Sequence, residues 1–191
     1  MPATRSELIA RAQLLLPPRR AESTIPARSD DLEEHLLRAL YGLALRAKTD
    51  DEVRRQMTKT ASFTLDADST IVTTNAAFED ILPEAWDGAE LYVTGFTAPA
   101  SYCRDYRTFS LGTPRAGIAR WFVGEGRLQV RGANSSLTAS KACTLRDAIF
   151  VPTVSEATPA SNTLPVDLED DIVGMIVAAQ LEKLAAAGAQ G

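Results

Sequence analysis

The chain has 191 residues, of which 45% are hydrophobic and 24% are charged. These are the values of an ordinary globular protein, and the length suits one domain with at most a small appendage. The net charge of −5 and the lack of a run of clustered Lys and Arg argue against a protein that grips duplex DNA. Since no apolar stretch approaches the roughly 18 residues that cross a bilayer, we expect no membrane contact.

Residues 1–60 are predicted to be helical. Capping-box patterns at Thr4–Glu7, Asp30–Glu33 and Thr49–Glu52 indicate three helix starts, because in each the first side chain satisfies a free amide and the Glu reaches back to the cap. Pro17 and Pro18 end the first helix, since proline lacks the backbone donor that a helix interior needs.

The second predicted helix, from Asp31 to about Lys48, has a wide apolar arc. Leu36, Leu40 and Leu43 fall on one stripe, and further apolar residues fall on an adjoining stripe. An arc of this width favours packing by more than one neighbour. We therefore expect these three leucines in a helix-packing or oligomer interface.

Residues 61–155 have the pattern of short β-strands. ASFTLD alternates in polarity, GIARWFV and GRLQVRG are short runs bounded by turn residues, and VGEG between these two is typical of a hairpin turn. Strands of this kind with no helices between them indicate an antiparallel sandwich or a barrel-like module.

Residues 164–188 are predicted to form a C-terminal helix whose middle, from Ile172 to Leu181, has no charged residue. The middle carries two opposed apolar stripes, which consist of Ile172, Met175 and Ile176, and of Val173, Val177 and Leu181. We expect the first stripe to pack on the N-terminal helices and the second on a neighbouring subunit, because monomers avoid large exposed apolar patches. The alternative is that the sheet covers the second stripe within one chain.

The fold class is accordingly α+β. The N-terminal helices (1–60) and the C-terminal helix (164–188) are expected to pack as a helical bundle, with the antiparallel β module (61–155) between them in the sequence.

No catalytic constellation is found. His35 is the sole histidine, and its spacing among leucines predicts a partly exposed helix residue rather than a base or ligand. Glu169–Asp171 form an acidic trio in a predicted first helical turn, where acids complement the helix dipole. Cys103 and Cys143 are expected to be buried free thiols. The sequence predicts no enzyme, no catalytic residues, no metal site and no cofactor.

Two further interpretations compete. Six arginines in the middle of the chain suggest a platform for single-stranded nucleic acid if aromatic residues interleave with them. They are Arg104, Arg107, Arg115, Arg120, Arg127 and Arg131.

Separately, FTLDADSTIVTTNAAFEDIL, from Phe63 to Leu82, resembles the opening of a PAS domain. That resemblance implies a ligand-sensing or protein-interaction module, with a small-molecule cavity lined by Ile71, Val72, Phe78 and Tyr92.

A second resemblance covers the chain from about Ser29 to Leu184. Its phrases are Leu82-Pro83-Glu84-Ala85-Trp86, Trp121-Phe122-Val123 leading to Gly126-Arg127-Leu128-Gln129-Val130, Phe150-Val151-Pro152, and Leu164-Pro165 running to Ile172-Val173. In this layout, amphipathic helices precede a β-rich module, which a polar linker joins to a final helix. The order is similar to that of the head–tail connector proteins of tailed bacteriophages, the adaptors that form a neck ring.

That resemblance implies a structural virion protein: a homo-oligomeric ring, a dodecamer of twelve copies, between the portal protein and a tail or nozzle protein. Its lumen would let DNA pass without specific binding. The chain would be made in the host cytoplasm and would be placed in the virion at the tail and neck.

Overall fold

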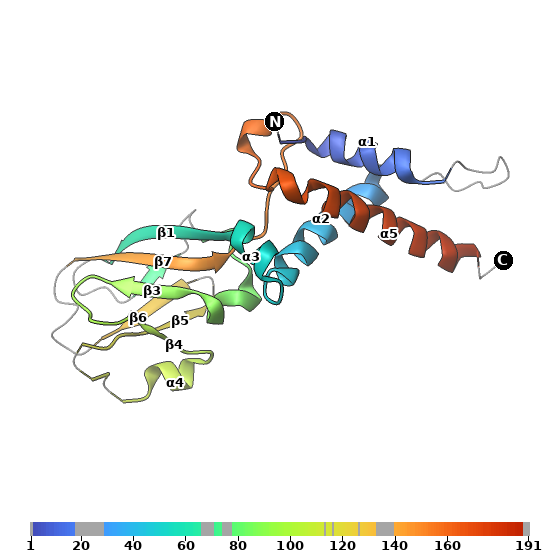
Figure 1. Ribbon diagram of the computed structural model, residues 1–191. Helices are drawn as coiled ribbons and strands as arrows, with labels where there is room; N and C mark the ends of the chain where they lie inside the picture. The colour runs from blue at the N-terminus through green and yellow to red at the C-terminus, as the bar shows by residue number, and fades with distance from the viewer. Residues whose placement is uncertain are drawn as a thin grey trace. The chain divides into compact units, whose positions relative to one another are not determined.

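The computed structural model describes residues 2–17, 29–65, 71–73, 78–112, 114–115, 117–125, 127–132 and 140–188. The fold is mixed helix and sheet. The chain divides into two compact units, which we call the helical unit (residues 1–46 and 151–191) and the β unit (residues 47–150). Figure 1 labels the α-helices and most of the strands.

The helical unit joins the two ends of the chain. It contains α1 (Arg5–Leu15), α2 (Ser29–Arg46), α5 (Glu169–Gly188) and two short 3-10 turns, η2 (Pro159–Ser161) and η3 (Val166–Leu168). The predicted packing of N-terminal helices with the C-terminal helix is present, because α1 and α2 both contact α5. The first capping box is confirmed: the Thr4 hydroxyl accepts from the Glu7 amide, and the Glu7 carboxylate accepts from the Thr4 amide at 2.7 Å.

Helices α2 and α5 pack antiparallel. At one end Arg46 pairs with Asp171, with 2.7 Å between Nη1 and Oδ2. At the other end Lys183 pairs with Asp31, with 2.8 Å between Nζ and Oδ2. Ion pairs at both ends fix the register of two helices whose shared face is mostly apolar.

The β unit begins with α3 (Asp51–Met57), which leads directly into β1 (Thr58–Leu65). Strands β3 (Glu90–Val93) and β7 (Lys141–Ile149) complete an antiparallel sheet in the order β1-β7-β3. The cap of α3 is Asp50, whose carboxylate accepts from the amides of Glu52 and Val53. The predicted cap at Thr49 was therefore wrong by one residue, and the β region starts at Thr58 rather than at about Ala61.

The second sheet contains β2 (Ile71–Thr73), β4 (Ser101–Tyr102), β5 (Arg120–Gly124) and β6 (Arg127–Arg131), in the order β2-β6-β5-β4. The predicted hairpin joins β5 to β6, with Gly124 opposite Arg127. One pairing departs from the antiparallel prediction, because β4 runs parallel to β5. The cause is a switch between sheets: Ala100 donates to the Leu91 carbonyl of β3 at 2.7 Å, and the next two residues pair with β5.

One hydrophobic core lies between residues of both sheets. Its fully buried members include Leu91 and Leu145 from the first sheet and Trp121 and Val130 from the second. The indole N–H of Trp121 donates to the Ala100 carbonyl at 3.1 Å, so the largest buried side chain has its polar atom satisfied. Among the described residues the strands form two sheets and no closed barrel.

Two short helical elements flank this core. The 3-10 helix η1 (Pro83–Gly88) places Ala85 and Trp86 against it, and α4 (Tyr106–Ser110) is capped by the Asp105 carboxylate, which accepts from the Thr108 amide. Proline at the first position suits the start of η1, since its missing donor would have no partner there.

Candidate functional site

Most residues predicted to form an interface are packed inside the chain. Of the nine, six are buried, and they are Leu36, Leu40, Leu43, Ile172, Val173 and Ile176. Met175 and Val177 are half-buried, and Leu181 is 42% exposed. A neighbouring copy could therefore contact the C-terminal end of the second stripe but not its start.

The burial of Val173 corrects the expectation that its whole stripe faces a neighbour. Helix α1 covers the start of α5: Arg11 pairs with Glu169, with 2.9 Å between Nη1 and Oε2, and the Ala3 amide donates to the same carboxylate at 2.7 Å. Val173 lies one turn beyond Glu169 on the same face and is 3% exposed. Since helical-wheel reasoning on α5 alone does not show where α1 lies, the sequence could not reveal this.

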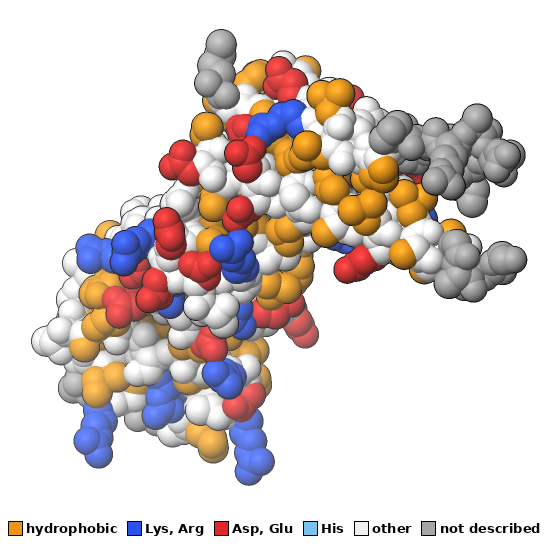
Figure 2. Space-filling view, turned by 45° about the vertical axis from the view of Figure 1, so that its right-hand side comes forward, with side chains coloured by type: hydrophobic (Ala, Val, Ile, Leu, Met, Phe, Trp, Pro, Cys, Tyr) orange, Lys and Arg blue, Asp and Glu red, His pale blue; other side chains and the backbone are white. Residues whose placement is uncertain are grey.

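The helical unit instead exposes a different apolar set. It consists of Leu14 and Leu15 of α1, Leu37, Tyr41 and Leu45 of α2, and Leu181 and Leu184 of α5. The α2 residues recur every four positions and so form one stripe, which we call the α2 stripe. Figure 2 shows apolar side chains gathered over the helical unit. Exposed aliphatic residues in this number are typical of an interaction surface.

The acidic trio at the start of α5 is used in ion pairs between helices. Glu169 and Asp170 both pair with Arg11, and Asp171 pairs with Arg46. In the described part of the chain, no group of three or more His, Cys, Asp or Glu is arranged to hold a metal ion.

His35 is buried, not partly exposed as predicted, because α5 covers it. Its Nε2 lies 3.1 Å from Oε1 of Gln180, which is buried as well. Gly42, two turns along α2, allows the close approach: a Cβ there would lie 2.8 Å from the Met175 methyl. His35 therefore has a structural position in the helix interface.

Three of the six central arginines are engaged in contacts within the fold. Arg120 donates to the carbonyl oxygens of Thr108 and Leu111, at 3.4 and 2.7 Å, and Arg131 donates to that of Ser110. The third is Arg104, which pairs with Asp87, with 2.8 Å between Nη2 and Oδ2. The nucleic-acid interpretation loses these three cations as free phosphate ligands.

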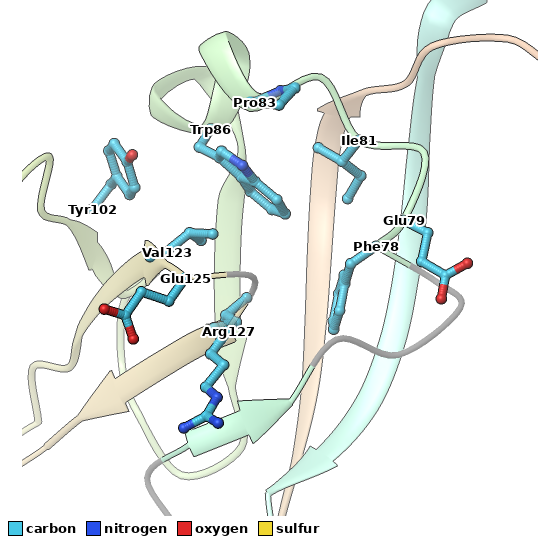
Figure 3. Close-up of a pocket in the computed structure, with 11 residues that line it drawn as sticks. Phe78, Glu79, Ile81, Pro83, Trp86, Tyr102, Val123, Glu125 and Arg127 are labelled. Carbon is cyan, nitrogen blue, oxygen red and sulfur yellow. The ribbon is translucent and has the colours of Figure 1, made fainter.

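The β unit contains a cavity of about 350 Å³, which we call the apolar pocket. This volume is within the range of pockets that take small molecules or side chains. Its walls are Phe78, Ile81, Pro83, Trp86, Tyr102, Val123 and Leu128, with Gly124 and the stems of Glu79, Glu125 and Arg127 at the edge. In Figure 3 the rings of Trp86 and Phe78 face the cavity, whereas the carboxylate of Glu79 and the guanidinium of Arg127 point away from it.

A second depression of about 350 Å³ adjoins the first, and we call it the polar pocket. The two share Pro83, Trp86 and Tyr102, which form a ridge of three rings between them. The other residues of the polar pocket are Lys48, Glu84, Asp87 and Arg104. Burial, together with the nearby Asp87 carboxylate, raises the pKa of the Tyr102 hydroxyl, so this group stays protonated and able to donate.

Strain is present at the edge of the apolar pocket. Glu125, in the β5–β6 turn, has a φ of 53°, in the left-handed region that non-glycine residues rarely adopt. Such strain is held only where the surrounding structure dictates it, and it is common at ligand sites.

The cavity expected from the PAS resemblance is matched at one residue. Phe78 lines the apolar pocket, but the Tyr92 ring lies under the Arg146 guanidinium, 4.6 Å from its Cζ, and its hydroxyl donates to Glu90. The side chains of Ile71 and Val72 lie outside the described residues.

Sequence reasoning missed the pockets themselves. The ridge combines Pro83 and Trp86 from η1 with Tyr102 from β4, and no local pattern joins positions that far apart. A usable signal was the phrase Leu-Pro-Glu-Ala-Trp, which places two rings on one short helical turn.

No model of a known protein family matches the chain, and a search of the curated proteins gives no match. None of the described helices has the length and hydropathy needed to cross a membrane.

Proposed function

We propose that the chain is a structural subunit of a homo-oligomeric ring, a head–tail adaptor between the portal and the tail of a tailed bacteriophage. The observation that carries this proposal is the set of exposed aliphatic residues on all three helices of the helical unit. The order of phrases along the chain supports the same family.

The energetics favour association over a monomer. Burying an aliphatic side chain contributes roughly 1.5–3 kcal/mol, and Leu37 alone is 61% exposed. The α2 stripe adjoins the buried face of its helix, whereas Leu181 and Leu184 belong to a different helix. Two unlike apolar surfaces on one subunit allow head-to-tail contacts, which form a ring when the rotation closes.

We also propose a finer arrangement of the helices and sheets within each unit. We interpret the three α-helices of the helical unit as a small bundle and the two sheets of the β unit as a sandwich. Support for the sandwich comes from the single core to which both sheets contribute.

Portal and tail proteins are the proposed partners, with twelve copies per ring as the resemblance implies. The helical unit has eight basic and twelve acidic side chains, so a lumen lined by it would repel duplex DNA and let it slide. We propose that no specific DNA site is needed.

Sedimentation velocity tests the ring. The unmodified chain should sediment as one large species, and Leu37→Asp or Leu181→Asp should reduce it to small species without loss of helical circular dichroism. Leu111→Asp, which places the same charge on an exposed leucine of the β unit, is the matched control and should leave the assembly intact. A compact monomer at high protein concentration, alone and with a portal protein, would contradict the proposal.

A second candidate is the ligand-sensing module, and the apolar pocket is the observation in its favour. It requires a small molecule bound in the β unit and a partner that responds. Saturable binding of a small aromatic compound such as indole, detected by changes in Trp fluorescence, would favour this candidate over a purely structural adaptor.

A further inference from the structure

The ridge in the β unit has the chemistry of a site for an extended proline-containing chain. Pro83, Trp86 and Tyr102 line both the apolar pocket and the polar pocket, and Trp86, which is 9% exposed, anchors this shared wall in the core. Grooves lined by aromatic rings bind segments in the polyproline II conformation. Such a segment has few internal contacts, and because it is already extended it loses little conformational entropy when it binds.

The chain itself carries a segment of matching chemistry. After α1, the sequence from Leu14 to Arg20 reads LLLPPRR: three leucines, two prolines and two arginines. Leu14 is 85% exposed and Leu15 is 66% exposed. Leu16 leaves the helix with φ −74° and ψ 143°, the dihedral angles of polyproline II, and the two prolines that follow restrict φ to the same region.

We propose that the ridge and its two pockets bind the Leu14–Arg20 segment of a neighbouring copy. A leucine of the segment fills the apolar pocket, the prolines lie on the ridge, and the arginines lie over the polar pocket. The polar pocket holds two carboxylates, Glu84 and Asp87, which the two arginines of the segment can approach, beside the cations Lys48 and Arg104.

Shape selects this segment over the other exposed apolar residues. The α2 stripe lies along the side of a helix and suits a flat surface, whereas residues at and beyond the end of a helix can enter a concave pocket. A segment on one surface that fits a pocket on another makes a head-to-tail contact, as the proposed ring requires. The inference therefore rests on the proposed homo-oligomer and identifies one of its contacts.

A peptide assay tests the contact directly. The probe is a fluorescein-labelled peptide with the sequence of residues 13–22, QLLLPPRRAE. The receptor is the full chain with Leu14→Ser, Leu15→Ser, Leu16→Ser, Pro17→Gly, Pro18→Ser, Arg19→Gly and Arg20→Ser, so that no copy supplies its own segment. Fluorescence anisotropy should show saturable binding, weakened at least about tenfold when both prolines of the peptide become alanine or both arginines become glutamate.

The receptor side has a matched control. Val123→Arg places a long cation in the apolar pocket and should weaken binding at least about tenfold, whereas Val166→Arg, on an exposed valine of the helical unit, should leave it unchanged. The peptide variants keep the test valid even if Val123→Arg fails to fold. The inference is overturned if the peptide does not bind. It is also overturned if the peptide binds but neither the changes in the peptide nor Val123→Arg weakens the binding.

Mixing shows which copy supplies the segment. The Val123→Arg chain keeps its segment but lacks the pocket, and the segment-replaced chain keeps the pocket but lacks the segment. In sedimentation velocity the two together should form a one-to-one pair that neither forms alone. If the unmodified chain forms a large assembly but the segment-replaced chain does too, the inference fails and the ring stands. If the unmodified chain stays monomeric while the peptide binds, the ring fails and the segment binds within its own chain.

Discussion

His35 and Gln180 meet in the interface between α2 and α5, with 3.1 Å between Nε2 of the imidazole and Oε1 of the amide. Both side chains are almost fully buried, and Nδ1 of His35 has no hydrogen-bond partner among the described residues. This polar contact lies among leucines and isoleucines, where an unpaired polar atom costs more than a paired one contributes.

Gln180→Leu should therefore destabilise the chain by about 1–3 kcal/mol, because it leaves the buried imidazole with no partner at either nitrogen. The double substitution His35→Leu with Gln180→Leu should recover much of that loss. Urea unfolding at fixed protein concentration, followed by circular dichroism, gives the free energies for a double-mutant cycle. A single Gln180→Leu variant as stable as the unmodified chain would show that the contact contributes nothing.

Features fixed by a few adjacent residues could be read from the sequence. The cap at Thr4 and the β5–β6 hairpin depend on local hydrogen bonds and turn chemistry, and both are present. The apolar faces of α2 and α5 were also recognisable, since Leu36, Leu43, Ile172 and Ile176 follow helical spacing and are buried.

Features fixed by distant residues could not be read. The burial of Val173 depends on where α1 packs, and the ridge depends on η1 meeting β4. Asp147, which interrupts the alternation of the last strand, belongs to a β-bulge: Lys59 pairs with Ala148 and Ala61 with Leu145, so two residues of β7 oppose one of β1.

The C-terminal helix offers a graded test of burial. Along one stripe, Val173 is buried, Val177 is half-buried and Leu181 is 42% exposed. Aspartate should cost about 3 kcal/mol or more at Val173, because an unpaired carboxylate would be buried, and about 0.5 kcal/mol or less at Leu181, with Val177 between them. Urea unfolding of the three variants measures the order. Equal costs at all three positions would contradict the observed packing of α1 on α5.

Two residues in the left-handed region form a matched pair for backbone strain. Glu125 has φ 53° and Asp147 has φ 56°. Glu125→Asn should stabilise the chain by about 0.5–1 kcal/mol, because asparagine tolerates this conformation and Asn-Gly is a favoured hairpin turn. Asp147→Asn should change stability little, since aspartate already tolerates the region. Thermal unfolding of both variants distinguishes the cases, and equal shifts would show that φ is not the cause.

Cys143 provides a prediction about pH dependence. Burial raises the pKa of its thiol to about 11 from an ordinary value near 9.0, because the thiolate would lose its hydration. Only the thiolate reacts with iodoacetamide, so at pH 8 about one Cys143 in a thousand is reactive, against about one in ten for an ordinary thiol. The labelling rate should therefore be at least about a hundredfold slower in the folded chain than in urea.

The same shift fixes how the rate responds to alkali. In the folded chain the rate at Cys143 should rise about tenfold per pH unit through pH 10 and level off only near pH 11, whereas an ordinary thiol levels off near pH 9. Mass spectrometry of the Cys143 peptide follows labelling at this position separately from Cys103, whose pKa is also raised by burial. A Cys143 rate that levels off near pH 9 while the chain is still folded would mean that its thiol is hydrated, and that the core beneath β1 and β7 opens to water.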